Sequence, residues 1–119
     1  MESLYLRLGR GQGIGAVVDG FYDRVVADPS LAPFFVRTRM SAQRRHLTAV
    51  VAAATGGPAY RGRSLRDAHE RLGIQRQHFD AVASHLVAEL ESRGVDADVI
   101  DELVAAIAPL ADQVVTDGR

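Results

Sequence analysis

The segment from Ser64 to Gly73 limits the possible folds most, because it predicts a helix that cannot exist alone. Ser64 and Asp67 have the spacing of a helix N-terminus, and Gly73 suits a left-handed C-terminal cap. A helix of roughly two turns is far below the ~12–15 residues at which isolated helices become even marginally stable in water. Other parts of the chain, or a ligand, must therefore hold this helix in place.

One face of this short helix is apolar apart from a histidine. The residues that share the face at i, i+3, i+4 and i+7 spacing are Leu65, Ala68, His69 and Leu72. His69 is either a packed core residue, hydrogen-bonded to a carbonyl, or a ligand that ties the helix to something else. The segment taken alone is compatible with both interpretations.

The composition excludes several classes of function. The chain has 119 residues, which fits a single domain over residues 1–119, and a net charge of −1 with no long run of like charges. This argues against a nucleic-acid partner and against a polybasic membrane patch. The absence of cysteine removes disulfides, thiol catalysis, iron–sulfur ligation and thioether-linked haem. Without a signal sequence or a membrane-anchor segment, we expect a cytoplasmic protein.

Apolar residues repeat at helical period along most of the chain, which predicts an all-α fold. We expect helices over about residues 14–25, 42–54, 75–93 and from 96 onward, with a short element around Phe34 and Phe35. Ser41 has the position of an N-cap for the second of these helices. Pro109 is expected to kink the last helix near Ala105.

The glycines near the N-terminus raise the question of a dinucleotide-binding fingerprint. Gly11, Gly13 and Ala16 fit the pattern G-x-G-x-x-G/A. That fold also needs parallel strands and an acidic residue about 20 positions further on, whereas the downstream sequence is helical in pattern. We therefore interpret the glycines as a flexible hinge between helices. Gly20, inside the next helix, is expected where another backbone crosses closely.

Several kinds of catalytic site are not supported by the polar residues of the expected interior, which are Tyr22, Gln43, His46, His69 and His85. The zinc pattern H-E-x-x-H begins at His69 but ends in glycine. No serine has the setting of an activated nucleophile, and no carboxylate lies on an apolar stripe.

A haem pocket fits the residues that remain. Such a pocket needs an imidazole on the proximal side of the iron, apolar and aromatic walls, and hydrogen-bond donors on the distal side. His69 can supply the imidazole, and Tyr22 with Gln43 can supply the donors. The candidate walls are Phe34, Phe35, Val50, Phe79 and Leu86.

A set of short motifs, taken together and in order, resembles the group I truncated haemoglobins. These motifs are Phe21-Tyr22, Phe34-Phe35, Met40 to Gln43, Gly56-Gly57-Pro58, Leu65 to His69, and Phe79. The resemblance extends from about residue 3 to residue 115. It implies a two-over-two helical sandwich around non-covalent haem b, which is iron protoporphyrin IX, and dioxygen, nitric oxide and carbon monoxide as ligands.

The resemblance also implies roles for individual residues. His69 is carried over as the proximal iron ligand, Tyr22 as the main distal donor and Phe35 as the ring stacked on the haem. Gln43 and Leu47 fall at distal positions facing the ligand, and Leu47 stands where many members have glutamine. The residues expected to contact the haem are Phe34, Phe35, His46, Leu47, Val50, Arg63, Leu65, Ala68, Leu72, Phe79 and Leu86.

His46 falls where cyanobacterial relatives place a second histidine that binds the iron from the distal side. The resemblance therefore implies bis-histidyl coordination by His69 and His46 when no gas is bound. The competing role is a surface residue near a haem propionate, because Arg44 and Arg45 flank it. Those relatives also attach haem through a histidine near the C-terminus. No histidine follows Leu110, so covalent attachment is not expected.

The resemblance supports three functions, and a fourth remains as an alternative that does not depend on the resemblance. The first is reversible binding of dioxygen and other diatomic gases. The second is nitric oxide dioxygenation, which yields nitrate and needs an external reductase. The third is electron transfer or redox chemistry by a bis-histidyl haem. A cofactor-free helical interaction module is the alternative, and it predicts no haem absorption band in the purified protein.

Overall fold

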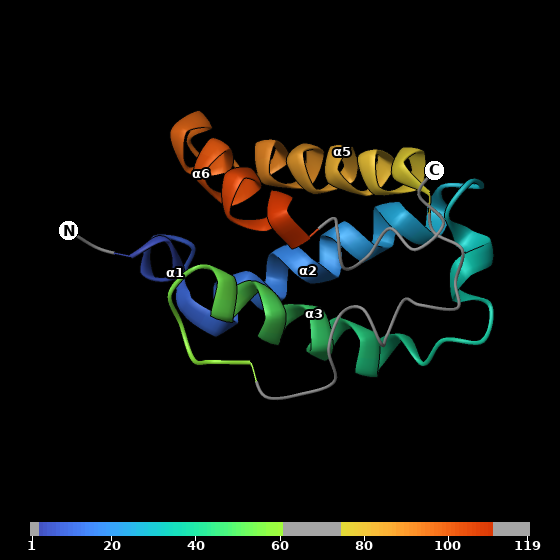
Figure 1. The fold of residues 1–119 in the computed structure, drawn as a ribbon, viewed down its shortest axis with the longest axis horizontal. Coiled ribbons are helices and arrows are strands. Elements are labelled where there is room, and N and C mark those ends of the chain that lie inside the picture. Colours follow the sequence, from blue (N-terminus) through green and yellow to red (C-terminus); the bar gives the residue numbers. More distant parts are fainter. Residues whose placement is uncertain (1–2, 61–74, 111–119) are drawn as a thin grey trace.

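The computed structural model of the chain describes residues 3–60 and 75–110. Every regular element in these two ranges is helical (Figure 1). The elements are α1 (Leu4–Arg7), α2 (Arg10–Ala27), η1 (Ala32–Phe35), α3 (Met40–Ala54), α5 (Arg76–Ser92), α6 (Ala97–Ile107) and η2 (Ala108–Leu110), where η marks a 3₁₀ helix. The expected all-α fold is confirmed. The helix predicted over Ser64–Gly73 lies outside the described residues.

The four long helices form two pairs, one over the other, with α2 and α3 in one pair and α5 and α6 in the second (Figure 1). Helix α2 is central, because it packs against both α3 and α5. This is the two-over-two arrangement expected from the sequence. The core between the pairs is apolar and includes Ile14, Val18, Phe21, Tyr22, Val25, Leu31, Val51, Leu86, Leu90, Ile100 and Leu103.

Helix α2 begins further back than expected, and the interpretation of the early glycines as a hinge is wrong. Gly9, with φ +91°, precedes the helix, and Gly11 and Gly13 lie within it. A side chain at Gly13 would collide with the carbonyl of Leu8, at the end of α1. The glycines therefore allow α1 to pack closely on the first turns of α2, rather than giving the chain a flexible joint.

Gly20 does mark a close approach, but the neighbour is a side chain rather than a backbone. A Cβ at Gly20 would collide with the carboxylate of Glu89 on α5. Glu89 is only 7% exposed, and Arg24 and Arg93 both donate hydrogen bonds to it. A buried carboxylate therefore does occur in the helix interface, contrary to expectation. It is matched by two guanidinium groups that reach it from α2 and from the end of α5.

Two predicted helix ends also differ from the structure. Helix α3 begins at Met40 with Arg39 at the N-cap, so Ser41 lies inside the first turn and does not cap it. Helix α6 continues through Ala105 and ends at Ile107, and the chain then tightens into η2, which contains Pro109. A proline ring clashes with the carbonyl four residues earlier, and here the α-helix ends before that clash arises.

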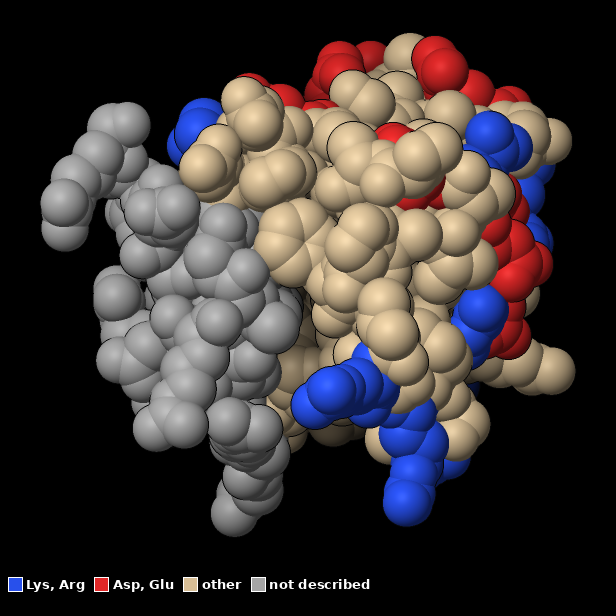
Figure 2. All heavy atoms as spheres, turned by 90° about the vertical axis from the view of Figure 1, so that its right-hand side faces the viewer, with Lys and Arg blue, Asp and Glu red and all other residues tan. Residues whose placement is uncertain are grey.

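Charges of both signs lie on the end of the molecule where η1 and the start of α5 are found (Figure 2). Uncharged side chains occupy most of the centre of this face, and arginines gather along its lower edge. Among the described helices, none is both long and apolar enough to cross a membrane.

Candidate functional site

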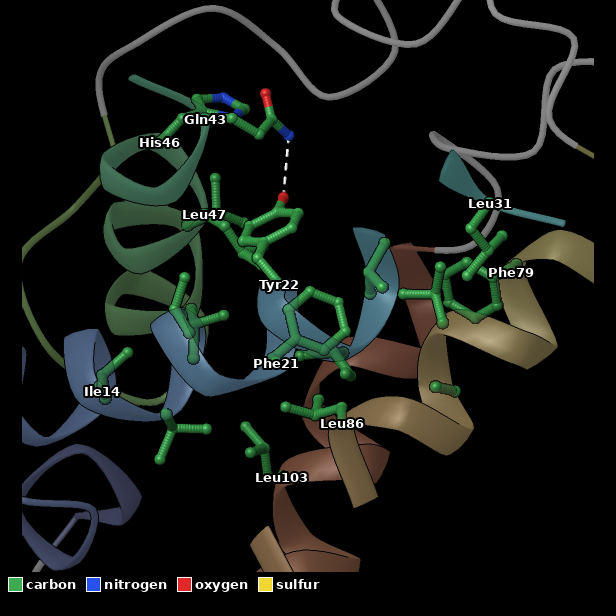
Figure 3. A pocket seen from close by; sticks show the side chains of 18 of the residues that line it. Ile14, Phe21, Tyr22, Leu31, Gln43, His46, Leu47, Phe79, Leu86 and Leu103 are labelled. Atoms are coloured by element: carbon green, nitrogen blue, oxygen red, sulfur yellow. Dashed lines mark hydrogen bonds between the residues drawn. The ribbon is translucent and has the colours of Figure 1, made fainter. Parts of the chain in front are cut away.

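A cavity of about 280 Å³ lies between the two helix pairs, beside α2 (Figure 3). Its walls are almost entirely apolar. The lining residues that carry polar side-chain atoms are Tyr22, Thr38, Gln43, His46 and His78. A concave, mostly apolar space with a few polar groups is typical of a small-molecule or cofactor site.

Tyr22 and Gln43 form the polar centre of this cavity. The Gln43 side-chain amide on α3 donates a hydrogen bond of 2.9 Å to the Tyr22 hydroxyl on α2 (Figure 3). Tyr22 is only 4% exposed. Within residues 3–60 and 75–110, the Gln43 amide is the only hydrogen-bond partner of this hydroxyl. The hydroxyl accepts that bond, so its own proton is available to a ligand.

Burial keeps the Tyr22 phenol protonated. It raises the pKa of Tyr22 to about 12, although the hydrogen bond from Gln43 and the nearby charge of Arg44 act in the opposite direction. Desolvation disfavours the charged phenolate, which explains the direction of the shift. At neutral pH the side chain is therefore a hydrogen-bond donor and not a base.

Arg44 holds the start of α3 against α2 and so fixes the distance between Gln43 and Tyr22. Its guanidinium donates to the carbonyl of Asp19 at 2.7 Å and to the carboxylate of Asp23 at 3.0 Å. The same group lies over the Tyr22 ring, with Cζ 5.7 Å from the ring centroid. Three contacts from one side chain thus tie the two helices together where the phenol and the amide meet.

Aromatic rings form the wall near η1 and the start of α5. Phe35 meets the Tyr22 ring edge to face, with centroids 5.8 Å apart, and Phe34 meets the His78 ring in the same way at 4.8 Å. Nδ1 of His78 accepts a hydrogen bond from the backbone N–H of Gln75, which closes the first turn of α5. These contacts hold the wall in place without using the interior of the cavity.

His46 lies one turn after Gln43 on α3 and also borders the cavity. Its Nε2 is 2.7 Å from the hydroxyl of Tyr60. The two rings meet edge to face, with centroids 5.3 Å apart and an angle of 71°. His46 therefore has a defined protein partner.

The structure brings together most of the residues that the sequence assigned to the site. The expected residues that line the cavity are Tyr22, Phe34, Phe35, Gln43, His46, Leu47, Val50, Phe79 and Leu86. The others, Arg63, Leu65, Ala68, His69 and Leu72, lie outside the described residues. His85, considered as an interior residue, does not line the cavity but is paired with Asp28 at 2.8 Å.

Sequence reasoning missed three polar residues at the site. Thr38 and His78 line the cavity, and Tyr60 contacts His46. The only available signal was for His78, which stands three residues after the N-cap Gln75 and immediately before the wall residue Phe79. Tyr60 gives no periodic signal, because it follows the turn after α3.

The fold and the cavity define a class of small, two-over-two helical proteins that enclose a ligand between their helices. The family model described as "Bacterial-like globin" matches residues 3–116. The chain therefore belongs to this family, whose members are gas-binding haem proteins, and within it to the truncated globins.

Relatives with similar sequences support this assignment over most of the chain. The chain is 39% identical over 115 residues to the group 1 truncated hemoglobin GlbN of Mycolicibacterium paratuberculosis, covering 96% of this chain and 85% of that protein. It is 42% identical over 113 residues to GlbN of a Synechocystis species, covering 91% of this chain and 90% of that protein.

Solved structures agree with the sequence comparison. The Fe(III) form of truncated hemoglobin from Tetrahymena pyriformis superimposes with a TM-score of 0.89 at 32% identity, covering 95% of this chain and 97% of that one. The 2/2 hemoglobin of a Synechococcus species, in the cyanomet state with covalently attached heme, also gives 0.89, at 36% identity and with 96% and 98% covered. The two-over-two interpretation is thereby confirmed.

Proposed function

We propose that this protein binds haem b non-covalently in the cavity beside α2 and reversibly binds dioxygen and other diatomic gases there. The observation that carries the proposal is the partly buried Tyr22–Gln43 hydrogen bond inside a mostly apolar space. A phenol and an amide in such a place are suited to donate to a small, weakly polar ligand.

The residues present fit a haem. The macrocycle is large, flat and apolar, and the aromatic wall of Phe34, Phe35 and Phe79 with Leu86 supplies matching surface. No carboxylate lines the described part of the cavity, so its walls would not repel the electron-rich ring. The buried donor proton of Tyr22 has no protein acceptor within the described residues, which is the state expected of a side chain meant for a ligand.

His69 is the residue we assign to the proximal iron position, on the sequence resemblance. The histidines of the described residues, His46, His78 and His85, each have a protein partner at a ring nitrogen.

On the distal side, Tyr22 would donate its proton to the ligand, and Gln43 would hold the phenol in position. When bound, the haem iron supplies the gas-binding site itself. Because Tyr22 keeps its proton across the physiological range, the donor would be present at any cellular pH. Leu47, in place of a second amide, leaves the hydrogen-bonding network limited to this pair.

Nitric oxide dioxygenation is a second candidate function, and one observation favours it. The cavity is lined by the Tyr22–Gln43 pair and also by Ile14 and Leu103, which lie well away from Gln43 (Figure 3). This apolar extension offers a second small gas a path to the donor pair. Dioxygen, nitric oxide and one electron from ferrous haem give nitrate, and an external reductase must then return the electron.

Haem titration tests the primary proposal. The purified protein should take up one equivalent of haem with a Soret band, and the reduced form should change spectrum reversibly between dioxygen and argon. His69→Ala should weaken or abolish the band, while His85→Ala, whose partner is Asp28 rather than the cavity, should keep it. A protein without a Soret band would contradict the proposal and favour a cofactor-free interaction module.

Rapid mixing separates the second candidate from the first. The oxygenated protein mixed with nitric oxide should give stoichiometric nitrate if dioxygenation is a main activity. Slow or absent conversion would rule out dioxygenation as a main activity and leave reversible gas binding as the only proposed function.

A further inference from the structure

We propose that Tyr60 is a positioning residue that holds His46 away from the haem iron and so keeps the distal side open to gas. The proposal rests on the proposed haem function, because it concerns coordination of the iron. It starts from the 2.7 Å contact between Nε2 of His46 and the hydroxyl of Tyr60, and from the edge-to-face packing of the two rings.

The contact occupies the nitrogen that a distal ligand would need. In one tautomer Nε2 carries hydrogen and donates to the Tyr60 oxygen, and in the other its lone pair accepts the Tyr60 O–H. Neither arrangement leaves a lone pair on Nε2 for a metal. The other nitrogen, Nδ1, adjoins the side-chain stem and reaches less far from α3. The His46–Tyr60 contact and iron ligation through Nε2 therefore exclude each other.

Tyr60 follows a glycine turn that packs against the start of the chain. The turn after α3 needs Gly56, whose φ is +101°, and Gly57, where a side chain would collide with the ring of Tyr5 on α1. The packing of this turn against α1 brings Tyr60 back alongside His46, 14 residues earlier. Tyr60 thus lies beside His46 just after a turn that packs against α1.

His46 could take either of two partners, Tyr60 or the haem iron, and the sequence resemblance implied only the iron. It borders the cavity in the same turn as Gln43 and Leu47, so release from Tyr60 would free the imidazole for the interior. One hydrogen bond corresponds to a factor of about 2–10 in such an equilibrium. Tyr60 would therefore adjust the fraction of bis-histidyl haem and the rate at which gas binds. It would do so without contacting the haem or the gas.

The test compares haem-loaded Tyr60→Phe with the wild type by ferric absorption spectrum and by the association rate of carbon monoxide with the ferrous form. We expect the ratio of low-spin bis-histidyl to open haem to rise about 2- to 10-fold. Carbon monoxide association should slow in proportion to the fall in the open fraction. The double variant Tyr60→Phe/His46→Leu should match His46→Leu alone, because the effect acts only through His46.

Tyr5→Phe is the matched control, because it also removes a tyrosine hydroxyl from this part of the molecule. That hydroxyl accepts a hydrogen bond from the N–H of Gly11 and does not contact His46. It should leave the spin state unchanged. A Tyr60→Phe spectrum equal to that of the wild type would overturn the role of Tyr60, and so would a wild type that is already entirely bis-histidyl. A wild type with no Soret band would instead contradict the haem function itself, and the inference with it.

Discussion

The side-chain amide of Gln43 donates a 2.9 Å hydrogen bond to the hydroxyl of Tyr22, joining α3 to α2 across 21 residues of sequence. The direction of this bond matters more than its length. Because the phenol oxygen accepts from Gln43, the phenol proton is not used in this bond and is available to a group in the cavity. The two side chains therefore act as one unit, in which the amide orients and the phenol donates.

Gln43→Leu should weaken ligand retention through Tyr22. The phenol would lose the partner that orients it, and we expect dioxygen to dissociate about 2- to 10-fold faster from the haem-loaded protein. Stopped-flow dissociation rates measure this. Gln77→Leu, an exposed glutamine on α5, is the control and should have no effect. If the effects of Gln43→Leu and Tyr22→Phe were strictly additive, the two side chains would not form a unit.

Gly20→Ala should lower the free energy of unfolding by about 1–3 kcal/mol, because the new Cβ would displace the Glu89 carboxylate that Arg24 and Arg93 hold. The alanine itself favours the helix by about 1 kcal/mol. Gly15→Ala is the control on the same helix, because a Cβ there makes only an ordinary contact with Thr48. It shows the gain in helix propensity by itself and should stabilise the protein. Equal effects of the two substitutions in chemical denaturation would contradict the role given to Glu89.

Glu89→Gln tests the charge of the same cluster. Burial by itself raises the pKa of Glu89, but hydrogen bonds from Arg24 and Arg93 outweigh it and hold the pKa below its usual range. The neutral amide would leave two guanidinium groups without their anion. We expect a loss of about 1–3 kcal/mol in the free energy of unfolding. Glu91→Gln, exposed on the same helix, should be nearly neutral; a comparable loss there would argue against a specific cluster.

The Asp28–His85 pair should make stability depend on acid pH. Hydrogen bonds from His85 and then from Ser30 lower the pKa of Asp28 to about 2. A depressed pKa stabilises the fold above the unfolded-state pKa of about 3.9, and this contribution is lost as the pH falls through about 2. The stability difference between wild type and Asp28→Asn should therefore be present at pH 5 and shrink between pH 4 and 2.

Denaturation curves at a series of pH values measure this difference. Asp101→Asn, an exposed carboxylate on α6, is the comparison and should not reproduce the trend. A difference for Asp28→Asn that stayed the same down to pH 2 would show that the pair adds no acid-dependent stability.

The sequence was informative wherever a pattern along one helix was enough. Apolar periodicity predicted the helices, and the polar exceptions on their faces, Tyr22 and Gln43, proved to meet in the cavity. The sequence was uninformative about contacts that depend on how two helices pack against each other. Nothing in the sequence of α2 indicates that Gly20 makes room for a carboxylate, and nothing in that of α5 indicates that Glu89 is buried. Both features arise only when α2 packs against α5.

The contact of Tyr60 with His46 could not be predicted from the sequence for a similar reason. A position after a glycine turn has no helical period, so its partner depends on how tightly that turn closes. The glycines before α2 show the opposite error. Their composition suggests flexibility, but in the structure they permit close packing of α1 on α2.

The rate at which dioxygen leaves the reduced, haem-loaded protein tests the proposed role of the cavity most directly. Tyr22→Phe keeps the ring and its packing against Phe35 but removes the donated proton. A hydrogen bond to a ligand that carries partial negative charge predicts dissociation at least about 10-fold faster in Tyr22→Phe than in the wild type. Equal rates, in variants with the same Soret band, would contradict the assignment of this cavity as the gas-binding site.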